Sequence, residues 1–136
     1  MTPTYKPYEA VAHVLTSYFD GLYESNADLL EKVFHPRAIY VTAIGGELLY
    51  RTMDIYMPVI RSRRSPESLG ERRADKIISI EFAGPVTAMA RVECAIGATA
   101  YVDLLTFIHI DGRWQIISKV FDSHPRTDLV AEAVQS

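Results

Sequence analysis

The 136-residue chain has very little cysteine: Cys94 stands alone, so an internal disulfide bond is excluded. Cys94 lies among Val92, Ala95 and Ile96, a setting typical of a packed core thiol rather than of a nucleophile. No apolar run is long enough to cross a bilayer, and the N-terminal segment lacks the apolar core of a signal peptide. We therefore expect a cytoplasmic protein without a membrane segment.

The chain also lacks an excess of positive charge. It has 14 lysine and arginine residues against 17 acidic ones, a formal net charge of -3. Proteins that bind nucleic acid or anionic membranes usually present a basic surface, so we predict neither activity. The arginines gather in residues 61–73, where Pro66 and Gly70 indicate a loop. We expect this loop to be solvated or, with Arg63, to hold an anionic group of a ligand.

Motifs for several kinds of chemistry are missing. The sequence contains no HExxH motif, cysteine pair or acidic cluster, so we predict no metal site. No glycine-rich phosphate loop follows a predicted strand, and no serine has the glycine flanks of a hydrolase nucleophile. We accordingly predict no cofactor.

What the chain does have is helical patterns first and long strands last. A helix is predicted over residues 7–24, a short second helix ends at His35-Pro36, and a third follows Thr52 with a kink or an irregular end at Pro58. Strands are predicted over residues 38–44, 48–51, 74–83, 86–96, 99–110 and 113–122. This order predicts one α+β domain over residues 1–136, with residues 1–6 and 125–136 loosely ordered.

The last strands are apolar on both faces, which a sheet with one solvated face would not be. Val102, Leu104, Thr106 and Ile108 share one face, and Tyr101, Leu105 and Phe107 share the other. We expect a second copy of the chain to cover the outer face, giving a homodimer.

Three segments carry a family resemblance: residues 18–23 (YFDGLY), 34–38 (FHPRA) and 111–121 (DGRWQIISKVF). With the order of elements, they resemble the nuclear transport factor 2-like superfamily, in its SnoaL-like or lumazine-binding branch. The resemblance covers nearly the whole chain. It implies a cone-shaped α+β fold in which a strongly bent antiparallel sheet wraps around the N-terminal helices.

Ketosteroid isomerase is a distant member of this superfamily and uses a tyrosine and a neutral aspartic acid as oxyanion donors. By register, this resemblance places Tyr18 and Asp103 at the two donor positions. The position of the catalytic base falls near Thr42, which cannot act as a base at neutral pH. The resemblance therefore implies a pocket for a carbonyl or enolate oxygen, but not steroid isomerisation.

Asp103 is the most informative candidate, because it lies in a strand that is otherwise nearly free of charge. A buried carboxylate must pair, become protonated or line a wet cavity. Lys119 or Arg91 could form a salt bridge with it, and the distance to Lys119 depends on whether the last hairpin contains a bulge. His35 is a candidate general acid or base. The expected pocket walls are Tyr40, Tyr56, Met57 and Phe121.

Three functions remain open from the sequence. The first is a cofactor-free acid–base enzyme of the isomerase, dehydratase or cyclase type, in which Asp103 or His35 moves a proton and Tyr18 holds an oxygen. The second is a carrier of a flat aromatic or heterocyclic metabolite, which the aromatic residues would hold and Asp103 or Lys119 would orient. The third is a structural or partner-binding module. For the first two functions we expect an apolar cavity of roughly 300–1,000 Å³ between the first helix, the third helix and the concave face of the sheet.

Overall fold

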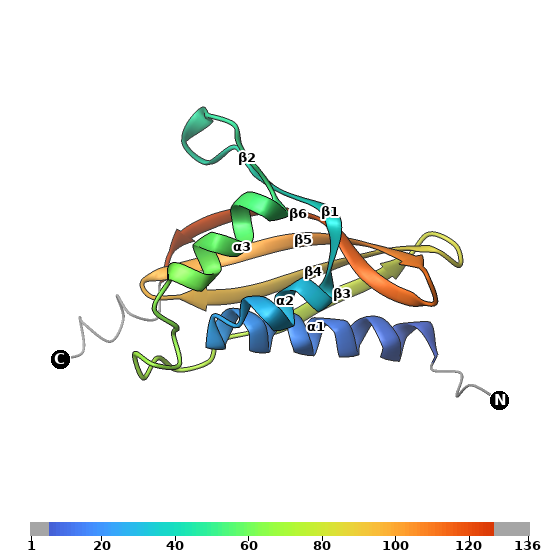
Figure 1. The fold of residues 1–136 in the computed structure, drawn as a ribbon, viewed down its shortest axis with the longest axis horizontal. Coiled ribbons are helices and arrows are strands. Elements are labelled where there is room, and N and C mark those ends of the chain that lie inside the picture. Colours follow the sequence, from blue (N-terminus) through green and yellow to red (C-terminus); the bar gives the residue numbers. More distant parts are fainter. Residues whose placement is uncertain (1–5, 127–136) are drawn as a thin grey trace.

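The computed structural model describes residues 6–126, which form three helices and a curved, open six-stranded sheet (Figure 1). The strand order is β2-β1-β6-β5-β4-β3, and all neighbours are antiparallel except β1 and β6. The strands are β1 (Phe34–Thr42), β2 (Leu49–Thr52), β3 (Lys76–Phe82), β4 (Thr87–Ile96), β5 (Thr99–Ile110) and β6 (Arg113–Pro125). The predicted α+β class and bent sheet are confirmed.

Helix α1 (Pro7–Glu24) has the predicted bounds. Pro7 occupies the first turn, where a missing amide costs no hydrogen bond, and Ser25 ends the helix in the left-handed conformation. Its apolar stripe is buried against the sheet and α2, while the opposite side faces solvent. The buried members of the stripe include Val11, Leu15, Tyr18, Phe19 and Leu22.

Helix α2 (Ala27–Val33) is short and capped by Asn26, whose side chain accepts a hydrogen bond from the Leu29 amide at 3.1 Å. It ends at Val33, and β1 starts at once with Phe34. His35 and Pro36 thus lie inside a strand that begins four residues earlier than predicted. A proline favours extended geometry in the residue before it, and for this reason the sequence predicted the end of the helix. It did not predict that a strand begins at the same point.

Helix α3 (Met53–Ser62) begins after Thr52, as predicted, and runs through Pro58. Thr52 is the N-cap residue, although its side chain makes no capping hydrogen bond. The helix packs on α2 and on β1, and a loop from Arg63 to Asp75 leads on to β3. The β1–β2 hairpin, closed by a 3-10 turn at Ile44–Gly46, projects from the body beside α3 (Figure 1).

The two faces of the sheet differ in burial. The face toward the helices contributes Ala90, Val92, Leu105, Phe107 and Ile116 to the core, all fully buried. The opposite face exposes Leu104 and Val120, which lie opposite each other in the β5–β6 ladder. The predicted loose ends lie almost entirely outside the described residues, although Pro125 belongs to β6. Among the described helices, none is long and apolar enough to span a membrane.

Candidate functional site

A buried carboxylate lies at the centre of the concave face. Asp103 of β5 has no solvent exposure, and its Oδ2 accepts a 2.6 Å hydrogen bond from the Tyr18 hydroxyl of α1. The Cys94 thiol of β4 lies 4.0 Å from the same oxygen. Within residues 6–126, the other oxygen, Oδ1, is buried and has no hydrogen-bond partner. A fully buried acceptor of this kind is costly unless something else occupies its free position.

Lys119 of β6 supplies the neighbouring positive charge. Its Nζ lies 3.9 Å from Asp103 Oδ2, within range of a salt bridge but too long for a hydrogen bond. The predicted alternative partner, Arg91, has an exposed position on β4. Of the two partners that the sequence left open, the structure selects Lys119.

A bulge in the last hairpin brings Lys119 to the concave face. The β5–β6 register shifts between Thr106 and Phe107, and Ile117 has no residue opposite it. Beyond the shift, Lys119 lies opposite Leu105, two residues along β5 from Asp103 and therefore on the same face. A regular ladder from the turn would have paired Lys119 with Leu104 on the convex face, because a slip of one residue inverts the facing of a strand.

Four aromatic rings surround the Lys119 ammonium group. The distances from Nζ to the ring centroids are 5.3 Å for Tyr18 and Tyr40, 5.4 Å for Phe121 and 5.6 Å for Tyr56. Tyr40 and Tyr56 are stacked, with their centroids 4.6 Å apart. All are within the range of cation–π attraction, which is strongest for a desolvated cation. We call Tyr18, Asp103, Lys119 and this set of rings the inner cluster.

The environment changes how the inner cluster titrates. Burial, reinforced by the Asp103 charge, raises the pKa of the Tyr18 phenol and raises that of the Cys94 thiol to about 12. Burial has the largest single effect on the pKa of Lys119 and lowers it, but attraction to Asp103, with smaller contributions from Tyr56, Cys94 and Tyr40, makes the net shift upward. Tyr18 is therefore neutral and Lys119 cationic at neutral pH. The Tyr18 hydroxyl donates its hydrogen bond to Asp103, which leaves the Lys119 ammonium as the group free to stabilise negative charge on a ligand.

Two of the predicted site residues lie elsewhere. His35 lies on β1 near the α2–α3 side of the molecule, where its Nδ1 accepts a hydrogen bond from the Arg37 amide at 3.0 Å. Arg63 follows α3 and places its Nη2 3.4 Å from the Leu22 carbonyl oxygen. Thr42 hydrogen-bonds the Phe121 carbonyl at 2.7 Å, a structural contact. The roles assigned to His35 and Arg63 stay predictions.

The cavity predicted between α1, α3 and the sheet is not confirmed, because the rings and aliphatic side chains of the inner cluster fill this space. A small cavity of about 20 Å³ lies beside Cys94, enough for about one water molecule. A larger cleft, of about 440 Å³, lies instead between α2, the start of β1 and α3. Its lining includes the predicted residues His35 and Met57.

Sequence reasoning found the members of the inner cluster but missed their arrangement. Tyr40, Tyr56 and Phe121 were predicted as walls of a ligand pocket, whereas they surround a lysine of the chain itself. The alternation of Lys119 and Phe121 in β6 was an available signal, since both face the same side of a strand. Among the described residues, no group of histidine, cysteine or acidic side chains is placed to hold a metal ion.

Comparison with known proteins places the chain among others of this architecture. The family model described as "Putative lumazine-binding" matches residues 6–122. The chain is 27% identical over 125 residues to a Cladobotryum protein named Aldolase FrzH, covering 90% of this chain and 96% of that one.

Solved structures agree on the fold. A nuclear transport factor 2-like protein of unknown function from Silicibacter pomeroyi is 25% identical, with a TM-score of 0.76 over 86% of this chain and 95% of that one. A similar protein from Shewanella baltica is 22% identical, with a TM-score of 0.79 over 92% of this chain and 100% of that one. A ketosteroid isomerase-like protein from Erwinia carotovora atroseptica is 11% identical, with a TM-score of 0.67 over 87% and 96%.

Proposed function

Because this chain belongs to the putative lumazine-binding family, within the nuclear transport factor 2-like fold, we propose that it binds a small carbonyl compound and catalyses cofactor-free acid–base chemistry on it. The observation that carries this proposal is the free Oδ1 of Asp103, buried beside a buried ammonium group. A buried carboxylate oxygen with no partner among the described residues has the position of a general base that awaits its substrate.

The proposed step is removal of a proton from the carbon next to a carbonyl group. Asp103 Oδ1 takes the proton, the C–H electron pair forms a carbon–carbon double bond, and the carbonyl oxygen becomes an enolate. The Lys119 ammonium stabilises this developing negative charge in a site with little water, where electrostatic stabilisation is strongest. Tyr18 holds the other carboxylate oxygen and so fixes the orientation of the base.

The enolate has several possible fates, and the reaction type follows from which one the ligand allows. Return of the proton to a different carbon gives isomerisation, and loss of a hydroxyl group gives dehydration. Attack of the enolate carbon on a second carbonyl gives an aldol product or a ring. The similarity to a protein named Aldolase FrzH supports the last of these.

A second candidate function is non-catalytic binding of a flat heterocycle. The stacked pair Tyr40 and Tyr56 supports it, since such rings can also stack on a planar ligand. The family description, which names lumazine, supports the same function.

The substitution Asp103→Asn distinguishes the two candidates. Deuterium exchange at the α-carbon of methyl naphthyl ketone, followed by NMR, measures proton removal directly. We expect wild-type protein to accelerate exchange and Asp103→Asn to slow it by roughly 10²–10⁴-fold, the usual contribution of a general base. Cys94→Ala, which removes a neighbour of Asp103 Oδ2 but leaves the reacting Oδ1 in place, is the matched control and should retain most of the rate. Binding of the ketone without exchange in wild-type protein would favour the carrier instead.

A further inference from the structure

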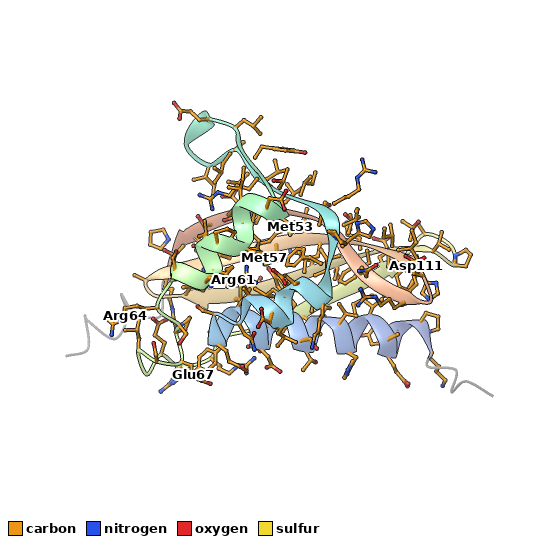
Figure 2. All side chains as sticks on the ribbon, viewed as in Figure 1. Met53, Met57, Arg61, Arg64, Glu67 and Asp111 are labelled. Atoms are coloured by element: carbon orange, nitrogen blue, oxygen red, sulfur yellow. The ribbon has the colours of Figure 1, made fainter. Side chains whose placement is uncertain are left out.

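The cleft between α2, the start of β1 and α3 has the size and lining of a small-molecule site. Its volume is about 440 Å³, within the usual range for organic ligands of roughly 300–1,000 Å³. Met53, Met57 and Arg61 follow one another at four-residue spacing along α3 and so share one face of this helix (Figure 2). The full lining is Glu31, Phe34, His35, Pro36, Met53, Asp54, Met57, Pro58 and Arg61.

The lining separates into an apolar floor and a polar rim. Phe34, Met53 and Met57 are buried and form the floor, whereas Glu31, Asp54 and Arg61 are exposed. Methionine side chains are flexible and adapt to ligands of irregular shape. A floor of this kind suits the flat apolar part of a ligand, and the rim suits a few polar substituents on that ligand.

One aromatic ring separates this cleft from the inner cluster. Phe34 lines the cleft, and its ring centroid also lies 5.9 Å from that of Tyr18 and 6.0 Å from that of Tyr56, both with edge-to-face geometry. Tyr18 in turn donates to Asp103. The proposed base therefore lies only two side chains away from a cleft that opens to solvent.

Weak contacts join α2 and α3 at the exposed edge of their interface. Arg61 Nη2 pairs with Glu31 at 2.7 Å and with Asp28 at 3.2 Å, and all three side chains are about half exposed or more. Exposed ion pairs of this kind contribute little to stability, because water screens both charges. The polar contacts across this interface therefore do little to prevent a small separation of α3 from α2.

We infer that this cleft is the outer half of the ligand site: it holds the flat apolar body of the ligand, while Phe34 and Met57 move aside so that the carbonyl group reaches Asp103 and Lys119. The inference rests on the proposed function for the inner half. It explains how a base without any solvent exposure meets a substrate. It also assigns a place to His35, on the wall of the outer half, where it contacts the body of the ligand rather than the reacting carbon.

Methyl naphthyl ketone tests both halves in one sample, because its ring system fits the cleft and its acetyl group carries exchangeable α-protons. Carbon-13 labelling of the methionine methyl groups gives resonances from Met53 and Met57 on the floor. Met89, on β4 outside the cleft, serves as an internal control. We expect the ketone to shift the Met53 and Met57 resonances and to leave Met89 unchanged. Naphthalene, which has the body but no carbonyl, should shift the same two resonances.

A pair of substitutions then links the cleft to the chemistry. Met57→Trp fills the cleft and should weaken ketone binding by about tenfold or more, with a parallel loss of α-deuterium exchange at low ketone concentration. Met57→Leu conserves the volume and should stay within about twofold of wild type. A thermal melt of both variants identifies any loss of folding.

The outcomes separate the two proposals. Exchange that proceeds without a shift at Met53 or Met57, or that Met57→Trp leaves intact, overturns the outer half and leaves the acid–base function standing. Shifts at both methionines without exchange support the cleft as a ligand site and contradict the acid–base function. The absence of any methionine shift up to the solubility limit of both probes overturns the inference.

Discussion

At the scale of single residues, the main feature is a charged pair enclosed by aromatic rings. Asp103 and Lys119 are both almost completely buried, and each provides the main favourable charge for the other. Desolvation of two charges is costly, so such a pair adds little net stability compared with apolar side chains of the same size. Its retention in the core is better explained by chemistry than by stability, which agrees with the proposed role of both groups.

Removing one partner should be more damaging than removing both. Lys119→Met leaves the Asp103 carboxylate buried without a counter-charge and should lower the free energy of unfolding by about 3–5 kcal/mol. The double variant with Asp103→Asn should recover part of this loss, because no isolated charge remains. Urea denaturation measures both values. Lys76→Met, at an exposed position, is the control and should change stability by less than about 0.5 kcal/mol.

The same groups predict an alkaline transition. The folded-state pKa values of Tyr18 and Lys119 lie above their ordinary values of about 10.0 and 10.5. Their contribution to stability is therefore complete below about pH 10 and is lost as the pH rises through the folded-state values. Denaturation between pH 7 and 11 should show wild-type stability starting to fall above about pH 9, where the Cys94 thiol ionises in the unfolded chain, and falling more steeply above about pH 10. In the double variant Tyr18→Phe with Lys119→Met, this fall should be smaller. A fall identical to that of the wild type would contradict the buried placement of Tyr18 and Lys119.

Lys119 should also not act as a covalent nucleophile. Its raised pKa keeps the amine protonated at neutral pH, and only the neutral amine forms a Schiff base. Borohydride added in the presence of methyl naphthyl ketone should therefore leave the protein mass unchanged by mass spectrometry. A stable adduct on Lys119 would show that the lysine reacts directly and would replace the electrostatic role proposed for it.

At the scale of elements, the contact between α1 and α2 depends on a glycine. A Cβ atom built on Gly21 would come within 2.6 Å of Leu30 Cδ2, which is closer than packed atoms allow. Gly21→Ala should therefore destabilise the protein by about 1–3 kcal/mol, although alanine favours a helix by about 1 kcal/mol. Thermal denaturation measures the change. Combining Gly21→Ala with Leu30→Ala should show a favourable coupling energy, since the truncated side chain removes the clash.

Several elements could be predicted from the sequence, for physical reasons that lie within each segment. Helix α1 has a proline in its first turn and a regular apolar stripe, and β5 alternates between two long apolar faces, so both were predicted with correct bounds. The start of β1 could not be predicted in this way. Phe34 is apolar in either a helix or a strand, and its pairing with Ile116 of β6 is a contact distant in sequence.

The candidate site was predicted in composition but not in geometry. Tyr18 came from the family resemblance, and Asp103 came both from that resemblance and from its place in a strand nearly free of charge; the structure joins them by a hydrogen bond. The facing of Lys119 depends on Ile117, and no local feature of the sequence reveals which residue of a hairpin is left unpaired. The cleft was misplaced because its walls come from α2, β1 and α3, whose relative positions are set by tertiary packing.

At the scale of the whole molecule, the convex face of the sheet remains open. Leu104 and Val120 lie opposite each other there and are 41% and 44% exposed. We propose that a second copy of the chain covers this face, as the apolar pattern of β5 predicted. The inner cluster lies on the other face, so dimerisation through the convex side would leave both the cleft and the proposed active site accessible.

Light scattering at micromolar concentration should accordingly give about twice the chain mass of 15.3 kDa. Leu104→Lys combined with Val120→Lys places four like charges at the interface of two copies and should give a monomer. Glu9→Lys, on the exposed side of α1, is the charge-matched control and should remain dimeric. A wild-type protein that is monomeric under these conditions would contradict the proposed dimer.

The unpaired Ile117 also has a consequence for how relatives of this chain diverge. Loss of this one codon would remove a residue that has no partner in the ladder, and every neighbouring pair, including Leu105 with Lys119, would keep its facing. Loss of a codon just after Lys119 would instead place Phe121 opposite Leu104, so that its ring would face outward and no longer contact the ammonium group. When homologous sequences are aligned, a gap at position 117 is therefore neutral for the interior, whereas a gap just after position 119 marks a lineage in which the ring of Phe121 no longer covers the lysine.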